Sequence, residues 1–140
     1  MATAPTYPSA SGPIAVATRL AESDSTNIVD VIDNSAGTTA IKVEALNVTT
    51  DNTADRILKL HLYSGAVSHL LGSRTIADLS GTNGATDPRV DMMALLGKAG
   101  ADGVQCIWVP AGTKLQASLD AALASGKYLY ITGRAITYGA

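Results

Sequence analysis

The sequence predicts an all-β protein: an antiparallel β-sandwich, jelly-roll-like, with one short helix and an extended N-terminal arm. Three observations support this prediction. About eight short segments are apolar or alternate between apolar and polar residues, as strands do. Clusters of Gly, Asn, Asp, Ser and Thr separate them at short intervals. Only one segment has the signals of a helix. A chain of 140 residues fits one domain, which we place at 14–140 after an arm at 1–13.

The composition favours a protein that packs against neighbours. Charged residues make up 16% of the chain, against about 25% in a typical soluble domain. The surface is therefore covered largely by Thr, Ser, Asn, Ala and Gly, which suits association better than free diffusion. The net charge of -2 predicts no binding to nucleic acid or to an anionic membrane.

The arm "MATAPTYPSASGP" contains three prolines that exclude a helix and favour an extended path. Two interpretations stay open: a frayed terminus, or an arm that lies over a neighbouring subunit with Tyr7 as its anchor. In the second interpretation the candidate partner contacts are Pro5, Tyr7, Pro8 and Pro13.

The first strands are expected in "PIAVATRL", "NIVDVID" and "AIKVEALNVTT". In the second segment, Val29 and Val31 should share one face. In the third, Ile41 and Val43 alternate with polar residues, but the apolar residues that follow continue on the opposite parity. A slip of one residue turns side chains to the other face, so we predict a β-bulge near Ala45, where the strand bends toward the other sheet.

"RILKLHLY" at 56–63 has the clearest strand pattern. Its three leucines should face inward, while Lys59, His61 and Tyr63 face outward. "SGAVSHLLGSRTIADL" continues with a turn at Ser64-Gly65 and another strand.

"DPRVDMMALLGKAG" predicts the one helix. Asp87 can cap its start, Pro88 fits the first helical position, and Gly97 can end it. Val90 and Met93 would lie on its packed side.

"GVQCIWVPAGTKLQASL" predicts a hairpin whose turn is Pro110-Ala111-Gly112. Cys106 and Trp108 share a face and are expected inward, which makes the thiol buried and inert. On the return strand, Leu115, Ala117 and Leu119 should face inward. "KYLYITGRAITYG" should form the last strand, with its tyrosines at 128 and 130 on the face opposite Leu129 and Ile131.

Candidate chemical sites are weak. His61 and His69 could begin a zinc site, but zinc needs three or four ligands. Asp51 and Asp55 lack the spacing of a calcium loop, and Asp87 with Asp91 fits the start of a helix. No nucleophile, phosphate or dinucleotide motif is present. We therefore predict no catalytic residue, no metal and no cofactor, and hence a protein that is not an enzyme.

A run of segments over residues 40–138 resembles small virion proteins of tailed bacteriophages, of the capsid cement or decoration type. The segments are the alternating strand "RILKLHLY", a short helix, "WVPAGTKLQASL" and a final strand. The ending "AITYGA" departs from the Gly-Gly-Asp-Tyr type of ending of that group.

The resemblance implies a non-enzymatic structural protein that oligomerises, commonly as a homotrimer, and binds the outside of a capsid. Its partners would be the major capsid protein and further copies of itself. It would be made in the host cytoplasm, since the start shows no secretory signal, and would reside on the virion. The alternative is a carbohydrate- or receptor-binding β-sandwich of a phage tail, which an exposed strip of the tyrosines 128, 130 and 138 would favour.

Overall fold

The computed structural model describes residues 10–82, 89–93, 98–99 and 105–138. These ranges form ten strands and one short 3₁₀ helix: β1 (Ala10–Ala21), η1 (Glu22–Asp24), β2 (Val29–Asn34), β3 (Ile41–Thr50), β4 (Arg56–Ser64), β5 (Val67–Ile76), β6 (Val90–Asp91), β7 (Lys98–Ala99), β8 (Gln105–Val109), β9 (Thr113–Leu119) and β10 (Tyr128–Tyr138).

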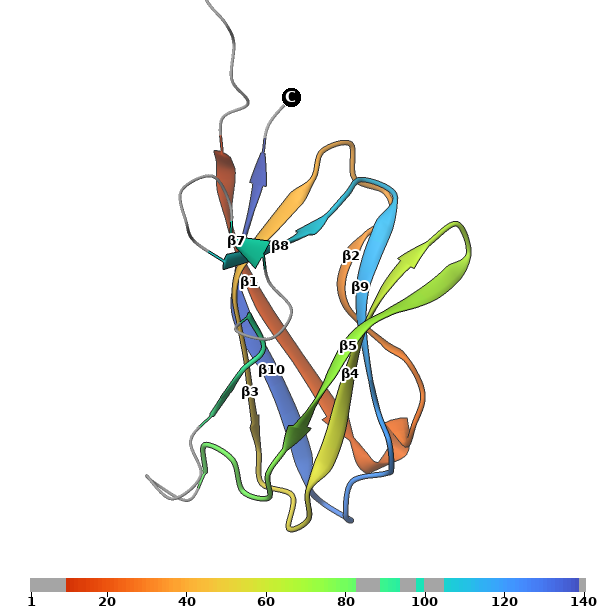
Figure 1. Cartoon of the computed structure of the whole chain (residues 1–140), viewed down its shortest axis with the longest axis vertical. Helices are drawn as coiled ribbons and strands as arrows, with labels where there is room; N and C mark the ends of the chain where they lie inside the picture. Colours follow the sequence, from red (N-terminus) through yellow and green to blue (C-terminus); the bar gives the residue numbers. More distant parts are fainter. Residues whose placement is uncertain (1–9, 83–88, 94–97, 100–104, 139–140) are drawn as a thin grey trace, which may run out of the picture.

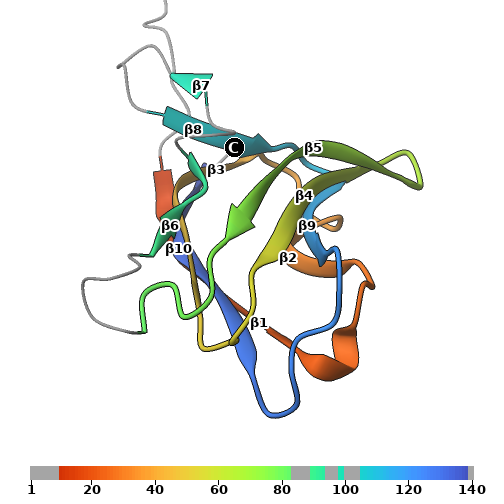
Figure 2. The same ribbon diagram turned by 60° about the horizontal axis from the view of Figure 1, so that its bottom comes forward.

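The strands form two antiparallel sheets that pack face to face (Figures 1 and 2). Sheet A has the strand order β1-β10-β3-β8-β7, with β6 also paired to β3. Sheet B has the order β2-β9-β4-β5. The predicted antiparallel β-sandwich is therefore confirmed.

The pairing shows how the chain is wound. β4 pairs with β5, β3 with β8, β2 with β9 and β1 with β10. In this order, the pairs follow one another along a single long hairpin ribbon that starts at the β4–β5 turn and ends at β1 and β10. Successive pairs lie alternately in sheet B and sheet A. A ribbon rolled up in this way is a jelly roll. Its tip is the two-residue loop Gly65-Ala66, where both residues have positive φ (59° and 63°), as hairpins of this loop length favour.

The segment 107–119 is consequently not a hairpin, which corrects the prediction. β8 belongs to sheet A and β9 to sheet B, so Pro110-Ala111-Gly112 carries the chain from one sheet to the other. The local prediction of strand, turn and strand was right. The partner strands were wrong, because neighbours in sequence pair with strands far along the chain.

The β-bulge near Ala45 is confirmed. Ala45 pairs with Arg134, but the next pair joins Val43 to Ala135, so Glu44 is the extra residue. Burial changes parity at the same place, from Ile41 and Val43 to Leu46 and Val48. The expected bend toward the other sheet is wrong, since β3 stays in sheet A along its whole length.

Gly133 is required opposite this bulge. A Cβ atom there would overlap the carbonyl oxygen of Ala45 and lie 3.1 Å from the Cα of Leu46. The bulge presses backbone against backbone, and only a residue without a side chain fits between.

Strand β2 contains a second bulge, which was not predicted because Val29, Asp30 and Val31 alternate as in a regular strand. Asp30 pairs with Gln116 and Ile32 with Leu115, so Val31 is the extra residue. Ile32 is buried, and Val29 and Val31 are both half-buried and pack against the core, as their predicted common face implies.

The predicted helix is wrong at its start. Val90 and Asp91 form β6 and pair with Val48 and Asn47 of β3. The Asp91 carboxylate accepts a hydrogen bond from the backbone N–H of Met93 at 2.8 Å. Asp87, Pro88 and Gly97 lie outside the described residues.

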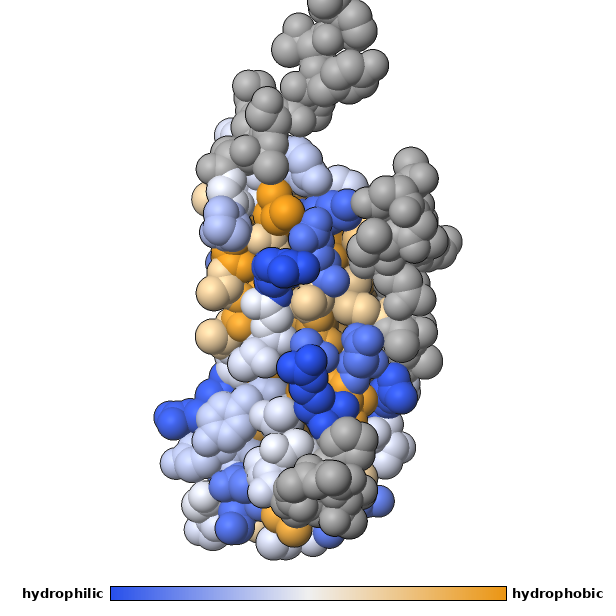
Figure 3. All heavy atoms as spheres, turned by 90° about the vertical axis from the view of Figure 1, so that its left-hand side faces the viewer, coloured by the Kyte–Doolittle hydropathy of each residue, from blue (hydrophilic) through white to orange (hydrophobic). Residues whose placement is uncertain are grey.

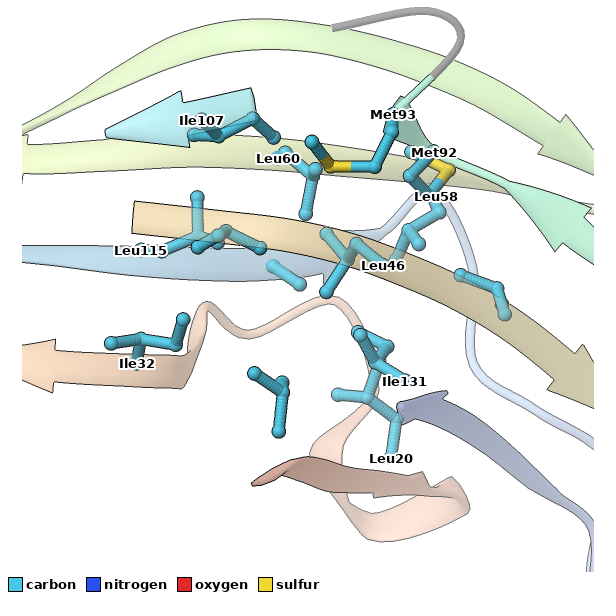
Figure 4. Close-up of a cluster of buried hydrophobic side chains, with 14 of the residues drawn as sticks. Leu20, Ile32, Leu46, Leu58, Leu60, Met92, Met93, Ile107, Leu115 and Ile131 are labelled. Atoms are coloured by element: carbon cyan, nitrogen blue, oxygen red, sulfur yellow. The ribbon is translucent and has the colours of Figure 1, made fainter. Parts of the chain in front are cut away.

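The core fills the space between the sheets (Figure 4). Sheet A contributes Leu20, Leu46 and Ile131, and sheet B contributes Leu58, Leu60 and Leu115, each at most 1% exposed. Met92 and Met93 are buried beside them after β6. The inward positions predicted for β9 and β10 are confirmed.

Two buried asparagines stabilise the crossings, the loops in which the chain passes from one sheet to the other. At the end of β2, the Asn34 side-chain amide donates to the carbonyls of Thr39 (2.9 Å) and Val109 (3.0 Å). The backbone carbonyl of Asn34 accepts from the N–H of Gly112 (2.9 Å). At the opposite end, the Asn52 amide donates to Ala54 and accepts from the N–H of Ala124. Each asparagine thus satisfies backbone groups of neighbouring crossings that the strands leave unpaired.

Candidate interaction surfaces

The outer face of sheet B carries a network of polar side chains that runs across four strands. Ser68 of β5 donates to Gln116 of β9 (2.7 Å), and Gln116 donates to Asp30 of β2 (2.8 Å). Lys114 lies 3.1 Å from Asp30, and its ammonium lies over the Tyr63 ring, 5.6 Å from the centroid. The network thus links β2 to its neighbour β9 and reaches from β9 past β4 to β5, the far edge of the sheet.

His61 also lies on this face, but its side chain is less exposed than the sequence indicated. Its outward direction is as predicted, but the side chain is buried, and its Nε2 lies 2.9 Å from the Ser118 Oγ. Its cross-strand neighbours are Leu70 of β5 and Gln116 of β9. Burial lowers the pKa of His61 below its ordinary value of 6.5, because the charged imidazolium would lose hydration, and the positive charge of Lys59 adds to this.

The charged side chains near β2 on this face form ion pairs and hydrogen bonds with one another and with Ser35. The hydrogen bond to Asp30 raises the pKa of Lys114. Hydrogen bonds from the hydroxyl and N–H of Ser35 (2.5 and 2.9 Å) lower the pKa of Asp33, to which Lys114 contributes from 3.8 Å. Strand β2 therefore presents two carboxyl groups, Asp30 and Asp33, at its edge of sheet B, with Lys114 of β9 beside them.

The outer face of sheet A displays aromatic side chains. Tyr128 and Tyr130 lie 6.2 Å apart between ring centroids, and the Arg19 guanidinium lies 4.4 Å above the Tyr128 ring. At the other end of the face, Trp108 and Tyr138 form a second pair at 5.8 Å. Figure 3 shows the side of the molecule on which β3 and β10 lie, where apolar and charged residues are interleaved.

Trp108 corrects a prediction. It was expected to point into the core, but its side chain is 49% exposed, and the inward residues of β8 are Ile107 and Val109. Lys42, its cross-strand neighbour, lies 5.9 Å from the indole centroid. Cys106 shares the parity of Trp108 and is nevertheless buried, as predicted, with a free thiol.

Strand β5 exposes a third group of apolar side chains. Val67, Leu70 and Leu71 are 53%, 61% and 42% exposed. Leu71 is the extra residue of a bulge, since Leu60 pairs with Gly72 and His61 with Leu70. This strand is the last of sheet B, opposite the charged edge at β2.

Of the four candidate contacts of the arm, the structure describes one. Pro13 lies inside β1 and pairs with Ile136 of β10. The first described strand, β1, includes residues 10–13 of the segment that was predicted to be the arm. Pro5, Tyr7 and Pro8 lie outside the described residues.

The candidate metal and acid groups do not converge. His61 and His69 are on opposite faces of sheet B, because His69 pairs with the inward Leu62. Asp51 accepts from the N–H of Tyr128 and Asp55 from that of Asp78, so both hold turns. Among the described ranges, no three His, Cys, Asp or Glu side chains gather as a metal site would require.

Within the residues that the structure describes, no helix is long and apolar enough to cross a membrane.

Comparisons with known proteins add little to this geometry. No protein-family model and no curated protein sequence matches the chain. A chain in a structure of turnip yellow mosaic virus at 100 K is similar with a TM-score of 0.37 and 13% identity, over 94% of this chain and 95% of that one. The assignment of the fold rests on the strand order alone.

Proposed function

We propose that the chain is a non-enzymatic virion structural protein that binds the outside of a phage capsid and stabilises it across capsomer boundaries. The observation that supports this most is the exposed apolar strand β5 on a jelly roll of low charge. A soluble protein that works alone usually protects such an edge with charges or covers it. Jelly rolls occur in viral capsid proteins and in lectins, so the fold supports the role by analogy only.

Stabilisation by such a protein follows from multivalency. Each copy would make a weak contact with the major capsid protein, and symmetry-related copies would hold together through contacts among themselves. The resemblance to cement proteins implies a homotrimer for this purpose. The arm adds a further contact by laying its main chain along a neighbour.

The test is cosedimentation of the purified protein with capsids of the phage whose genome encodes the chain. Saturable binding, together with a higher temperature of capsid disruption, is the expected result. Protein that stays in the supernatant at all concentrations would contradict the proposal. A capsid that binds the protein but breaks at an unchanged temperature would leave attachment and remove stabilisation.

The arm can be tested in the same assay. Deletion of residues 1–9 leaves all of β1 in place, so we expect an unchanged melting temperature and weaker capsid binding. The substitution Tyr7→Ala should weaken binding by less than the deletion. Equal binding with and without the arm would contradict its role as a contact.

The second candidate is a carbohydrate-binding role, which the exposed Trp108 favours. Indole and phenol rings that stand beside Lys42 and Arg19 offer an apolar face with a polar neighbour, as sugar-binding surfaces do. A glycan array with the wild type and Trp108→Ala distinguishes the two roles. Binding that the substitution abolishes would favour the carbohydrate role, and a silent array with capsid binding would favour the structural one.

A further inference from the structure

Strand β5 offers an open row of backbone hydrogen-bonding groups. Along one side it pairs with β4, and along its other side no strand of the described part of the chain pairs with it. Figures 1 and 2 show the β4–β5 hairpin extending away from the body of the sandwich. An edge of this kind accepts a further strand, because its N–H and C=O groups are satisfied by pairing.

The side chains along β5 do not oppose such pairing. The segment from Val67 to Ser73 contains no Lys, Arg, Asp or Glu. Its most exposed large apolar side chain is Leu70, at 61%, and Val67 and Leu71 are also exposed. A strand added here would cover this apolar surface as well as the backbone.

The other edge of sheet B is built in the opposite way. β2 carries Asp30 and Asp33 with Lys114 beside them, and a bulge at Val31. Both edge strands contain a bulge, at Val31 in β2 and at Leu71 in β5, so the two edges differ in charge rather than in regularity. Charges on an edge discourage pairing with another chain. The contrast lies within one sheet, so it singles out β5 as the edge that is left open.

A second copy of the same chain fits this edge. An antiparallel strand edge is complementary to itself across a two-fold axis. With Leu70 opposite Leu70 of the second copy, the residues on either side belong to the segment 67–73, which has no Lys, Arg, Asp or Glu, so no two like charges meet. Each Leu70 then contacts another apolar side chain at the centre of the contact.

We propose that β5 pairs antiparallel with β5 of a second copy about Leu70, which joins the two copies of sheet B into one continuous sheet. This contact is two-fold and does not depend on the virion role. It is also distinct from the three-fold contact of the homotrimer in the proposed function, which would form on the capsid, whereas the β5 contact forms in solution.

The test is the solution mass of the full chain by light scattering over a range of concentrations. The wild type should approach twice 14.3 kDa. Leu70→Lys and Leu70→Glu should each give the monomer mass, because like charges would then face each other across the axis. An equimolar mixture of the two variants should restore the doubled mass, because opposite charges meet.

The matched control is Ile28→Lys, which places a lysine at a 46% exposed apolar position beside β2, at the other edge of the sheet. It should keep the doubled mass. Far-UV circular dichroism of all variants checks that they remain folded, as expected for substitutions at exposed side chains.

Three outcomes would overturn the proposal. They are a wild type that stays monomeric at the highest concentration, a wild type with three times the monomer mass, and a dimer that survives both Leu70 substitutions. Capsid binding is measured separately, so a failed β5 contact leaves the proposed function standing, and the reverse also holds.

Discussion

The outer faces of the two sheets differ in which side chains they expose and which they bury. Sheet A exposes Trp108 and Tyr130, large aromatic residues that sequence patterns usually assign to the core. Sheet B buries His61, Gln116 and Ser118, polar residues that patterns assign to water. The alternation of a strand decides which face a side chain occupies. Its exposure depends on the neighbouring strands and on what lies over them.

The polar residues of sheet B are tolerated out of water because each has a partner. Among the described residues, no buried side-chain nitrogen or oxygen lacks a hydrogen bond. The network from Ser68 to Asp30 compensates the loss of hydration, and it does so only when the register of β5, β9 and β2 is correct. Sheet A has ion pairs instead, in which Glu44 lies 3.4 Å from Arg134 and 4.0 Å from Lys42, while its large aromatic side chains stay exposed.

The largest expected loss of stability is at the bulge of β3, which determines the side chains on the outer face of sheet A. Gly133→Ala should lower the free energy of unfolding by about 3 kcal/mol, because the new methyl group meets the backbone of Ala45. Urea denaturation measures it. The control is Gly126→Ala, which has open space but a positive φ of 72° and should cost only about 1 kcal/mol. Equal losses would show that the bulge adapts to the methyl group.

A smaller effect is expected where the two sheets are joined. Asn34→Ala leaves the carbonyls of Thr39 and Val109 without their donor and should cost about 2 kcal/mol by the same denaturation. Asn47→Ala, at a half-buried position on the outer face of sheet A, should change stability by less than about 0.5 kcal/mol. Similar values for both variants would remove the special role of Asn34.

The burial of His61 can be tested through pH. Because its pKa is lower in the folded protein than the ordinary 6.5, the unfolded chain binds the proton more readily. Stability should therefore fall as the pH drops below 6.5, by less than about 1.4 kcal/mol per pH unit, until the folded pKa is reached. His61→Gln should reduce this slope, while the exposed His69→Gln should retain it. An unchanged slope in His61→Gln would show that His61 is hydrated.

The smallest expected effect is at the tip of the ribbon in sheet B. Ala66 has a φ of 63°, a conformation that costs energy for a residue with a Cβ atom. Ala66→Gly should therefore raise the free energy of unfolding by about 0.5 kcal/mol, offset in part by the greater freedom of glycine in the unfolded chain. A higher melting temperature in calorimetry is the sign to look for, and a lower one would contradict it.

Some features of the candidate surfaces could be predicted from the sequence and others could not. The tyrosines of β10 were placed correctly because a long regular strand keeps its alternation. Trp108 was misplaced because β8 is short and its apolar residues occupy both parities, so the pattern did not distinguish its faces. The exposed β5 edge had no signal in the sequence, since "VSHLLGS" would read the same in the centre of a sheet.

By itself, the sequence determined the all-β class, the turns and the bulge at Ala45, because these depend on residues within a few positions of one another. Tertiary structure alone decided which strands pair. It placed β8 and β9 in different sheets, buried His61 and left β5 at an edge. Pairing is set by how the whole ribbon buries its apolar residues, and that minimum of free energy involves residues far apart in the chain.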